Sequence, residues 1–399
     1  MSASAEDKAP TEELHLIPWE NAENRREGPA VLLALKSVAF FGAIGFSGVV
    51  GFFVLMAWMP LLLLPCPRLY RRVGDMIGLW WVHIPAFLCN FVYRINLVVS
   101  GDALDPADHA AVFISNHATN FDWLFLWDFF LRQNRLLYEK IVLKGTLKVV
   151  PYFGWAMQVM KFLFLARNKD TDLPYLRAMM DSWCAARTPV QILLFPEGTI
   201  NDEPGLLSSR NYALKAALPF RRHSLYPRDG ALSLILSSLR GRGLSSLYDL
   251  TLGYPDVVPR AGFFAGHSPR EVHLHVKRYS VEELPVEAER QAEWLQELWG
   301  EKDRLLTRFY EQRQRFHDGS PILHSVPVTK RWRHQVQMIT AVLFFFFLVT
   351  LLTYLFITFS LTAFVVFLVV SHTIPVVVTY FGGFDQMELA YTGFLGKYP

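Results

Sequence analysis

Two long apolar blocks near the ends of this 399-residue chain constrain its fold more than any other feature. Residues 31–65 carry Lys36 as their only charged side chain, and residues 338–381 carry none except a possible charge on His372. At about 1.5 Å per helical residue, the first block reaches roughly 50 Å, well beyond the ~30 Å hydrocarbon core of a bilayer. A helix buried in a soluble domain is rarely this long. The blocks therefore predict membrane-embedded helices at both ends of the chain.

The two blocks and the segment between them predict different numbers of membrane passes. Residues 30–66 fit one transmembrane helix or a hairpin, and residues 338–381 fit two transmembrane helices joined by a turn at 358–360. Residues 67–100 are apolar but interrupted by polar side chains, so we expect an interfacial segment there rather than a full span. Glycine recurs at every third position of the first block, which favours close helix packing. These glycines are Gly42, Gly45, Gly48 and Gly51.

The overall composition excludes several classes of protein. Only 19% of the residues are charged, below the quarter or so that is typical of soluble domains. Lys plus Arg is 39 and Asp plus Glu is 36, so the formal charge of +3 gives no basic surplus for a dedicated nucleic-acid binder. The cysteines Cys66, Cys89 and Cys184 are too few and too scattered for a disulfide framework or a zinc site. We therefore expect a membrane protein with no nucleic-acid partner and no metal.

Basic clusters flank the central part of the chain. One follows the first block and the other precedes the second, and together they comprise Arg68, Arg71, Arg72, Lys330, Arg331 and Arg333. The positive-inside rule then places residues 67–337 on the cytosolic side. Arg25 and Arg26, before the first block, agree with this orientation only if that block is a hairpin. The other segments are expected to be a polar tail at 1–29, a basic linker at 321–337 and a tail at 382–399.

Residues 101–320 carry most of the charge and turn residues, which indicates one α/β domain. Short apolar or alternating runs predict strands at 110–115, 141–143, 191–195, 245–254 and 271–279. Helices are predicted at 122–131, about 145–160, 172–186 and 206–217, with an amphipathic helix at 287–316 that breaks near Gly300. Strands that alternate with helices favour an α/β layer fold.

The first candidate for catalysis is a histidine with a carboxylate five residues later. His117 ends a predicted strand, and Asp122 begins the following helix. A carboxylate on one ring nitrogen fixes the tautomer and leaves the other nitrogen free to take a proton from a hydroxyl. The spacing alone is weak evidence, because such pairs are common by chance. Alternatively, both residues have only structural roles, in which Asp122 caps a helix and His117 ends a strand.

A second polar cluster follows another predicted strand. Glu197, Gly198 and Thr199 come directly after the apolar run 191–195. Open α/β sheets place their sites at the carboxyl ends of strands, so the two clusters are expected to converge on one cleft, although a tight turn is the simpler alternative for Glu197-Gly198. Lys144 and Arg167 lie between the clusters in otherwise apolar sequence. Isolated cations of this kind often bind phosphate, although Arg167 would also suit a membrane surface.

Taken in order, these motifs resemble a known family. His117-x4-Asp122, Lys144 with Pro151 and Gly154, Phe195-Pro-Glu-Gly-Thr199 and Tyr226-Pro227-Arg228 resemble the four blocks of the glycerophospholipid (1-acylglycerol-3-phosphate-type) acyltransferase superfamily. Over about residues 30–320, further motifs are similar to its lysocardiolipin / lysophosphatidylinositol acyltransferase branch. They are Phe121-Asp-Trp-Leu-Phe-Leu-Trp127, Gly154-Trp-Ala-Met-Gln158, Tyr248-Asp-Leu-Thr251 with Tyr254-Pro255, and Pro269-Arg-Glu-Val-His-Leu-His-Val276.

The resemblance implies a fold and a reaction. The domain at 101–320 would be a mixed-sheet acyltransferase domain between membrane-embedded helices. His117, oriented by Asp122, would act as general base on a free glycerol hydroxyl of a lysophospholipid, whose oxygen attacks the thioester of acyl-CoA without another cofactor. The substrate-binding residues would be Glu197, Gly198, Thr199, Lys144, Arg167, Pro227 and Arg228. By the same analogy, the protein would be a multi-pass protein of the endoplasmic reticulum membrane, with its catalytic domain in the cytosol.

One departure from the family pattern bears on the acceptor. Ile200 stands where many members that use lysophosphatidic acid carry Arg after Glu-Gly-Thr, and losing such a phosphate contact costs about 2 kcal/mol. We therefore expect lysophosphatidylinositol, lysophosphatidylglycerol or lysocardiolipin as the acceptor. The first alternative is a 1-acylglycerol-3-phosphate acyltransferase that makes phosphatidic acid, and the second is an inactive membrane scaffold. A serine hydrolase is disfavoured because no Gly-x-Ser-x-Gly elbow is present.

Overall fold

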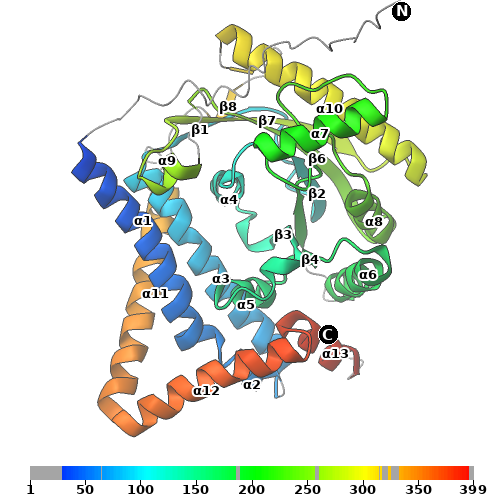
Figure 1. The fold of residues 1–399 in the computed structure, drawn as a ribbon. Coiled ribbons are helices and arrows are strands. Elements are labelled where there is room, and N and C mark those ends of the chain that lie inside the picture. Colours follow the sequence, from blue (N-terminus) through cyan, green and yellow to red (C-terminus); the bar gives the residue numbers. More distant parts are fainter. Residues whose placement is uncertain are drawn as a thin grey trace, which may run out of the picture.

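The computed structural model describes residues 29–63, 65–185, 189–256, 260–313, 315–316, 322–324 and 332–394. A single mixed sheet lies beside a group of long apolar helices (Figure 1). The expected polar tail lies outside the described residues except for Pro29, and residues 321 and 325–331 of the expected basic linker also lie outside them.

The sheet contains eight strands in the order β4-β3-β5-β2-β6-β7-β1-β8. Central strand β2 runs parallel to β5 and β6, whereas β6 and β7 are antiparallel, so the sheet is mixed. The strands are β1 Asn96–Gly101, β2 Ala110–Ser115, β3 Glu139–Lys144, β4 Leu163–Leu165, β5 Val190–Leu194, β6 Leu244–Gly253, β7 Glu271–Ser280 and β8 Ile322–His324. The five strands that the sequence predicted are all present. The α/β expectation with a mixed sheet is therefore confirmed.

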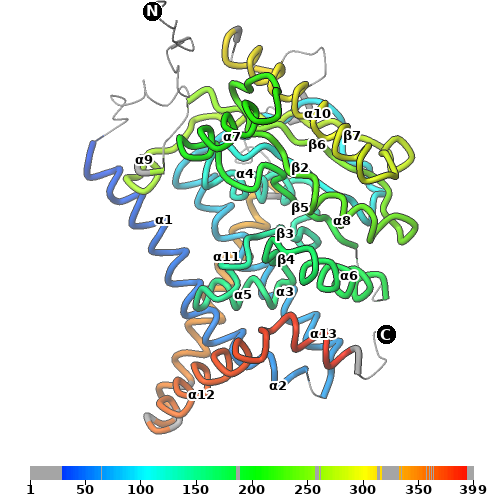
Figure 2. Tube along the Cα trace, turned by 45° about the vertical axis from the view of Figure 1, so that its right-hand side comes forward, coloured from blue at the N-terminus to red at the C-terminus, as the bar shows by residue number. Residues whose placement is uncertain are grey.

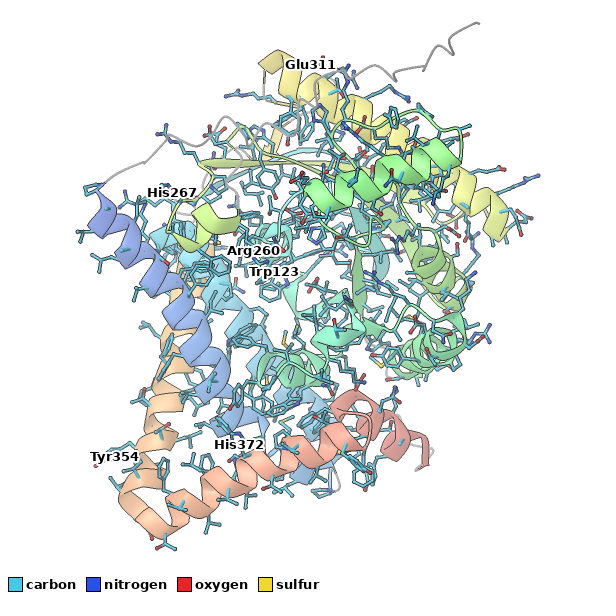
Figure 3. The ribbon with its side chains drawn as sticks, in the orientation of Figure 1. Trp123, Arg260, His267, Glu311, Tyr354 and His372 are labelled. Carbon is cyan, nitrogen blue, oxygen red and sulfur yellow. The ribbon has the colours of Figure 1, made fainter. Side chains whose placement is uncertain are left out.

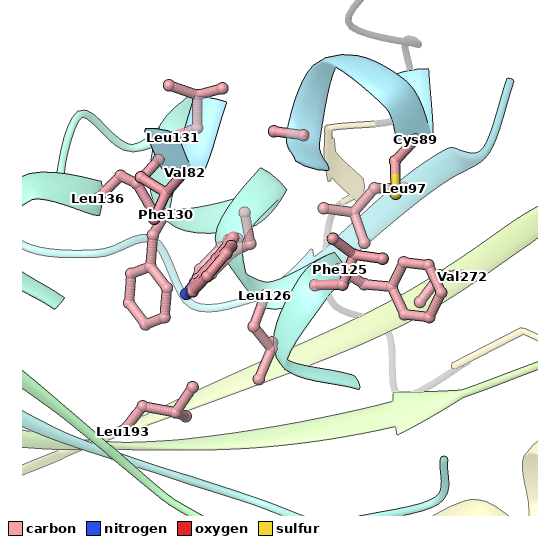
Figure 4. Packing of buried hydrophobic residues seen from close by; sticks show 14 of the residues in the cluster. Val82, Cys89, Leu97, Phe125, Leu126, Phe130, Leu131, Leu136, Leu193 and Val272 are labelled. Atoms are coloured by element: carbon pink, nitrogen blue, oxygen red, sulfur yellow. The ribbon is translucent and has the colours of Figure 1, made fainter. Parts of the chain in front are cut away.

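Helices cover both faces of the sheet, because alternate strand residues point in opposite directions. Phe113 of β2 packs in the hydrophobic cluster that contains α4, whereas its neighbours Val112 and Ile114 pack against α6, α8 and α10. Figure 4 shows part of the first cluster, where Leu126 of α4 lies above Leu193 of β5. The helices of the domain are α4 Asp122–Arg132, α5 Phe153–Val159, α6 Lys169–Ala185, α7 Glu203–Lys215, α8 Gly230–Leu239, α9 Arg260–Phe264 and α10 Ala288–Arg308.

Three of the described helices are long and apolar enough to cross a membrane, or four if the bent pair α12–α13 counts as one span. The first runs from Ala30 to Leu63 through a short π-helical segment, so the first block is one helix and not a hairpin. The chain turns back only between Leu63 and Pro67 (Figure 2). The flanking helices are α1 Ala30–Gly51, α2 Met59–Leu63, α3 Pro67–Phe87, α11 Trp332–Phe359, α12 Leu361–Tyr380 and α13 Phe384–Phe394.

Two boundaries at the membrane-facing end of the domain differ from the sequence expectation. Residues 67–92, which we expected to form an interfacial segment, form one continuous helix that is long and apolar enough to cross a membrane. The domain also begins before residue 101, because β1 starts at Asn96 and pairs with β7. The sequence could not separate this strand from the helix, since both are apolar.

The segment at 382–399 is not a simple tail, because most of it forms helix α13, which docks on the domain. Asp385 pairs with Lys148 at 2.8 Å, and Glu388 pairs with Lys161 at 3.0 Å and with Arg71 at 3.2 Å. The C-terminal helix is thereby joined to α3 and to the loop after β3. Arg71 is consequently held in buried ion pairs and is not a free flanking charge.

Two helix predictions in the domain were also inaccurate. The region 145–160 contains a 3-10 turn and then the short helix α5, because Tyr152 has a positive φ of 64° just before that helix begins. Helix α10 runs through Gly300 without a break. Burial of its neighbours Trp299 and Lys302 stabilises the helix there, which outweighs the cost of about 1 kcal/mol that a helical glycine carries.

Candidate active site

The structure brings His117 and Asp122 into contact. The Nδ1 atom of His117 lies 2.9 Å from Oδ2 of Asp122, and the His117 ring stacks on Phe195 with 4.3 Å between ring centroids. The Asp122 side chain is fully buried, whereas that of His117 is 19% exposed. With Nδ1 engaged, Nε2 is the nitrogen left to act on a substrate. This arrangement fits an oriented general base.

Further donors hold the Asp122 carboxylate in place. The hydroxyl of Tyr254 donates to Oδ1 at 2.5 Å, and the hydroxyl of Thr119 donates to the same oxygen at 2.8 Å. The Thr119 backbone N–H also reaches the carboxylate. No N–H group within α4 is bonded to this side chain, so the helix-cap alternative does not describe its contacts. Burial and the neighbouring carboxylate raise the pKa of Tyr254 well above its usual value, which keeps the phenol protonated as a donor.

Sequence reasoning missed Tyr254 as a member of the site, although it quoted the residue in a motif. Tyr254 follows β6, and 132 positions separate it from Asp122. Because β6 and β2 pair in parallel, their carboxyl ends lie side by side, and Tyr254 and Asp122 come after these two ends. The available signal was therefore a polar side chain at the carboxyl end of a third strand next to β2.

Glu197 lies beneath the site and not on its open surface. Its side chain accepts hydrogen bonds from the backbone N–H of His117 at 3.3 Å and from the indole of Trp299 at 3.0 Å. Burial raises the pKa of Glu197 to about 7, against the lowering effect of these two donors. One carboxylate oxygen thus holds the chain at His117, while the other is anchored by Trp299. A direct contact between Glu197 and substrate remains a prediction that this geometry does not favour.

A cavity of about 540 Å³ opens beside His117. Trp123, labelled in Figure 3, lines it together with apolar residues of β3, β5 and α8. Four cationic side chains contribute to its wall, against one carboxylate, that of Asp172. These cations are Lys144, Arg167, Lys169 and Arg228. The cavity therefore combines an apolar wall with positive charge, which suits a substrate that carries both an acyl chain and a phosphate.

Two arginines converge on Gly198 at the edge of this cavity. Arg167 donates from Nη2 to the Gly198 carbonyl at 2.6 Å, and the backbone N–H of Arg228 donates to the Pro196 carbonyl at 2.8 Å. Gly198 adopts a φ of +70°, which a residue with a Cβ rarely tolerates. Asp172 accepts from the backbone N–H groups of Ala166 and Asn168, on either side of Arg167. The loop that presents Arg167 is thereby fixed.

The structure separates the other predicted site residues into two groups. Lys144 and Thr199 line the cavity with His117, as do Gly198, Arg167 and Arg228. Pro227 is buried, and its carbonyl accepts a hydrogen bond from Gln296 at 3.1 Å, so it supports the loop from behind. Ile200 is not among the lining residues. Within the described ranges, no three His, Cys, Asp or Glu side chains form a group that could hold a metal ion.

Comparison with known proteins supports the assignment that the sequence motifs suggested. The sequence model of the family described as Acyltransferase matches residues 96–239, and the one described as Acyltransferase C-terminus matches residues 262–346. Lysocardiolipin acyltransferase 1 of Danio rerio is 39% identical over 74% of this chain and 74% of its own length. The Mus musculus protein of that name is 33% identical over 94% and 97%. Lysophosphatidylinositol acyltransferase 10 of Caenorhabditis elegans is 30% identical over 79% and 83%.

The two family matches identify an acyltransferase, and its mixed α/β sheet carries a His–Asp pair beside a cavity lined by cations. The chain belongs to the acyltransferase family and, more closely, resembles its lysophospholipid acyltransferases. The protein is therefore an enzyme, and the scaffold alternative is not retained. Its apolar helices indicate a membrane protein.

Proposed function

We propose that the protein transfers a fatty acyl chain from acyl-CoA to the free glycerol hydroxyl of lysophosphatidylinositol, lysophosphatidylglycerol or lysocardiolipin. One observation carries this proposal. His117 is held by Asp122 at 2.9 Å, and the same histidine lines a cavity with four cations. The names of the matching relatives support lysocardiolipin and lysophosphatidylinositol among these acceptors.

His117 and Asp122 supply the acid–base chemistry in this proposal. Nε2 of His117 takes the proton from the glycerol hydroxyl while the oxygen attacks the thioester carbonyl, and Asp122 stabilises the imidazolium that forms. The tetrahedral intermediate then expels the CoA thiolate as the carbon–sulfur bond breaks. The imidazolium returns its proton to that sulfur, which gives the ester and free CoA. No covalent enzyme intermediate and no further cofactor are required.

Binding is assigned to the groups around His117. Lys144, Arg167 and Arg228 line the cavity and would provide positive charge for phosphate, while Gly198 and Thr199, which also line it, would contact the glycerol. Glu197 holds the His117 backbone, so we propose for it a positioning role. The apolar residues of the cavity would accommodate an acyl chain.

A second candidate acceptor is lysophosphatidic acid, which would make the product phosphatidic acid. The sequence argument against it rested on Ile200, but this residue does not line the cavity. Arg167 and Arg228 lie within 4 Å of a Cβ built on Gly198, and they could supply charge to a bare phosphate. The relative kcat/KM values of the two acceptor classes distinguish the candidates.

The test is transfer of labelled oleoyl-CoA to a panel of lysophospholipids by the purified protein. We expect the highest kcat/KM with an acceptor whose phosphate is a diester. Fastest turnover on lysophosphatidic acid would overturn the headgroup assignment and support the second candidate. Absence of transfer to every acceptor would overturn the reaction itself.

We further propose that the protein resides in the endoplasmic reticulum membrane with its catalytic domain in the cytosol. Arg333, at the start of α11 and directly after the domain, supports this orientation by the positive-inside rule. Protease treatment of sealed microsomes tests it. The domain should be degraded without detergent, and full protection of the domain would contradict the orientation.

A further inference from the structure

A second cavity adjoins the one beside His117. Its volume is about 580 Å³, and it shares Lys144 and Arg167 with the first cavity as parts of their common wall. Beyond that wall it is bordered by Thr146 and Lys148 of the loop after β3, and by Gln386 of α13. A substrate whose phosphate meets Lys144 and Arg167 would thus have space for a further group on the far side.

The second cavity is positively charged. Lys144, Lys148 and Arg167 line it, and Asp172 is its only carboxylate among the described residues. Both oxygens of Asp172 are already engaged by backbone N–H groups. Lys144 is exposed and has no ion pair among the residues described, whereas Lys148 is paired with Asp385. An anion in this cavity would therefore meet cations and hydroxyls and no free carboxylate.

The C-terminal helix forms the far wall of this cavity. Asp385 accepts hydrogen bonds from Lys148 and from the Tyr175 hydroxyl, the latter at 3.0 Å, and the backbone N–H of Phe384 donates to Gln158 at 2.7 Å. These contacts fix α13 against the domain. Gln386, next to Asp385, is then the side chain that α13 presents to the cavity.

We propose that this second cavity is a binding subsite for a second phosphate group of a substrate, completed by Gln386 of α13. This inference rests on the proposed function, because it presupposes a first phosphate bound in the catalytic cavity. Two substrates could carry the second phosphate. One is the acyl donor, through the 3′-phosphate of CoA, and the other is an acceptor with an additional phosphate on its headgroup.

The test places opposite charges on Gln386 and compares substrates that differ by one phosphate. The variants are Gln386→Glu and Gln386→Lys, with Gln386→Ala as the neutral control. In the donor arm, oleoyl-CoA is compared with oleoyl-dephospho-CoA, which lacks the 3′-phosphate. In the acceptor arm, lysophosphatidylinositol phosphate is compared with lysophosphatidylinositol. Each preference is a ratio of kcat/KM values, so a partial loss of folded protein cancels.

We expect Gln386→Glu to lower the preference for the more phosphorylated substrate about threefold and Gln386→Lys to raise it about threefold, as for a partly exposed charge pair. The arm that responds identifies the source of the phosphate. Thr146→Glu and Thr146→Lys, on the opposite wall, should reproduce the pattern independently of α13. Unchanged ratios in both arms, with activity retained, would overturn this subsite. Absence of acyl transfer by the unmodified protein would instead overturn the proposed function.

Discussion

Replacing Asp122 with Asn tests how the carboxylate controls His117. The carboxylate accepts from the His117 ring at Oδ2 and from Tyr254 and Thr119 at Oδ1, so an amide can occupy the site in two orientations. If the amide nitrogen faces His117, the ring proton moves to Nε2, and the base is blocked. If the amide nitrogen faces the two hydroxyls, both can rotate to accept, and only the negative charge is lost.

Both orientations predict a large fall in rate with little loss of stability. Loss of the charge that stabilises the imidazolium should lower kcat about 10²-fold, and a blocked tautomer should lower it up to about 10⁴-fold. Tyr254→Phe alone keeps the His117–Asp122 contact and removes one hydrogen bond to a buried charge, which costs about 1.5–3 kcal/mol of stability. It should therefore reduce kcat far less than Asp122→Asn.

The double variant separates the two orientations. Without the Tyr254 hydroxyl, an amide nitrogen on that side loses an acceptor, which favours the orientation that blocks His117. Acyl transfer by the double variant should then be slower than the product of the two single effects. The assay is initial-rate transfer from labelled oleoyl-CoA in detergent, with circular dichroism as the folding control. A folded Asp122→Asn protein with kcat within tenfold of the unmodified protein would refute the reasoning.

Three further predictions follow from the site and its supports. Glu197 has a pKa raised to about 7, so folding favours its protonated form. The resulting contribution to stability is full below about pH 4.5 and is lost as the pH rises through 7. Thermal unfolding between pH 5 and 8 should therefore show a loss of about 3 kcal/mol in the unmodified protein that Glu197→Gln lacks. A pH dependence that persists in Glu197→Gln would contradict this. In steady-state kinetics, Arg167→Ala should raise KM about tenfold with little change in kcat. Arg167→Lys, which keeps the charge, should raise KM less. An unchanged KM in Arg167→Ala would count against phosphate binding. Gly154→Ala should destabilise the protein by about 2 kcal/mol in thermal unfolding, because its Cβ would lie 2.5 Å from the Leu147 and Lys148 carbonyl oxygens; an unshifted midpoint would refute the close approach.

The central strands could be predicted from sequence because burial on both faces makes them continuously apolar. Residues 110–115 were predicted with their observed bounds for this reason. Strand β1 was missed because it continues the apolar stretch of α3, so composition does not change between them. Helix α13 was missed because its fixing contacts, such as Asp385 with Lys148, join residues more than 200 positions apart.

The same distinction applies to the site. The His117–Asp122 contact is local, so a spacing of five residues between a strand end and a helix start made it a candidate, and the accompanying motifs strengthened that prediction. The sheet topology brings Tyr254 from the end of β6, and Trp299 from α10, to the site. Sequence spacing does not reveal these long-range contacts. The burial of Glu197 likewise depends on α10, which is why its motif alone suggested a direct substrate contact.

The central claim is that His117 is the base for acyl transfer to a lysophospholipid. The most direct measurement is the initial rate of transfer from labelled oleoyl-CoA to lysophosphatidylinositol by purified His117→Ala and unmodified protein, at matched folded concentration. The account predicts that the unmodified protein forms the labelled diacyl product and that His117→Ala lowers kcat by at least about 10³-fold. A His117→Ala protein that transfers the acyl chain within tenfold of the unmodified rate would contradict the account.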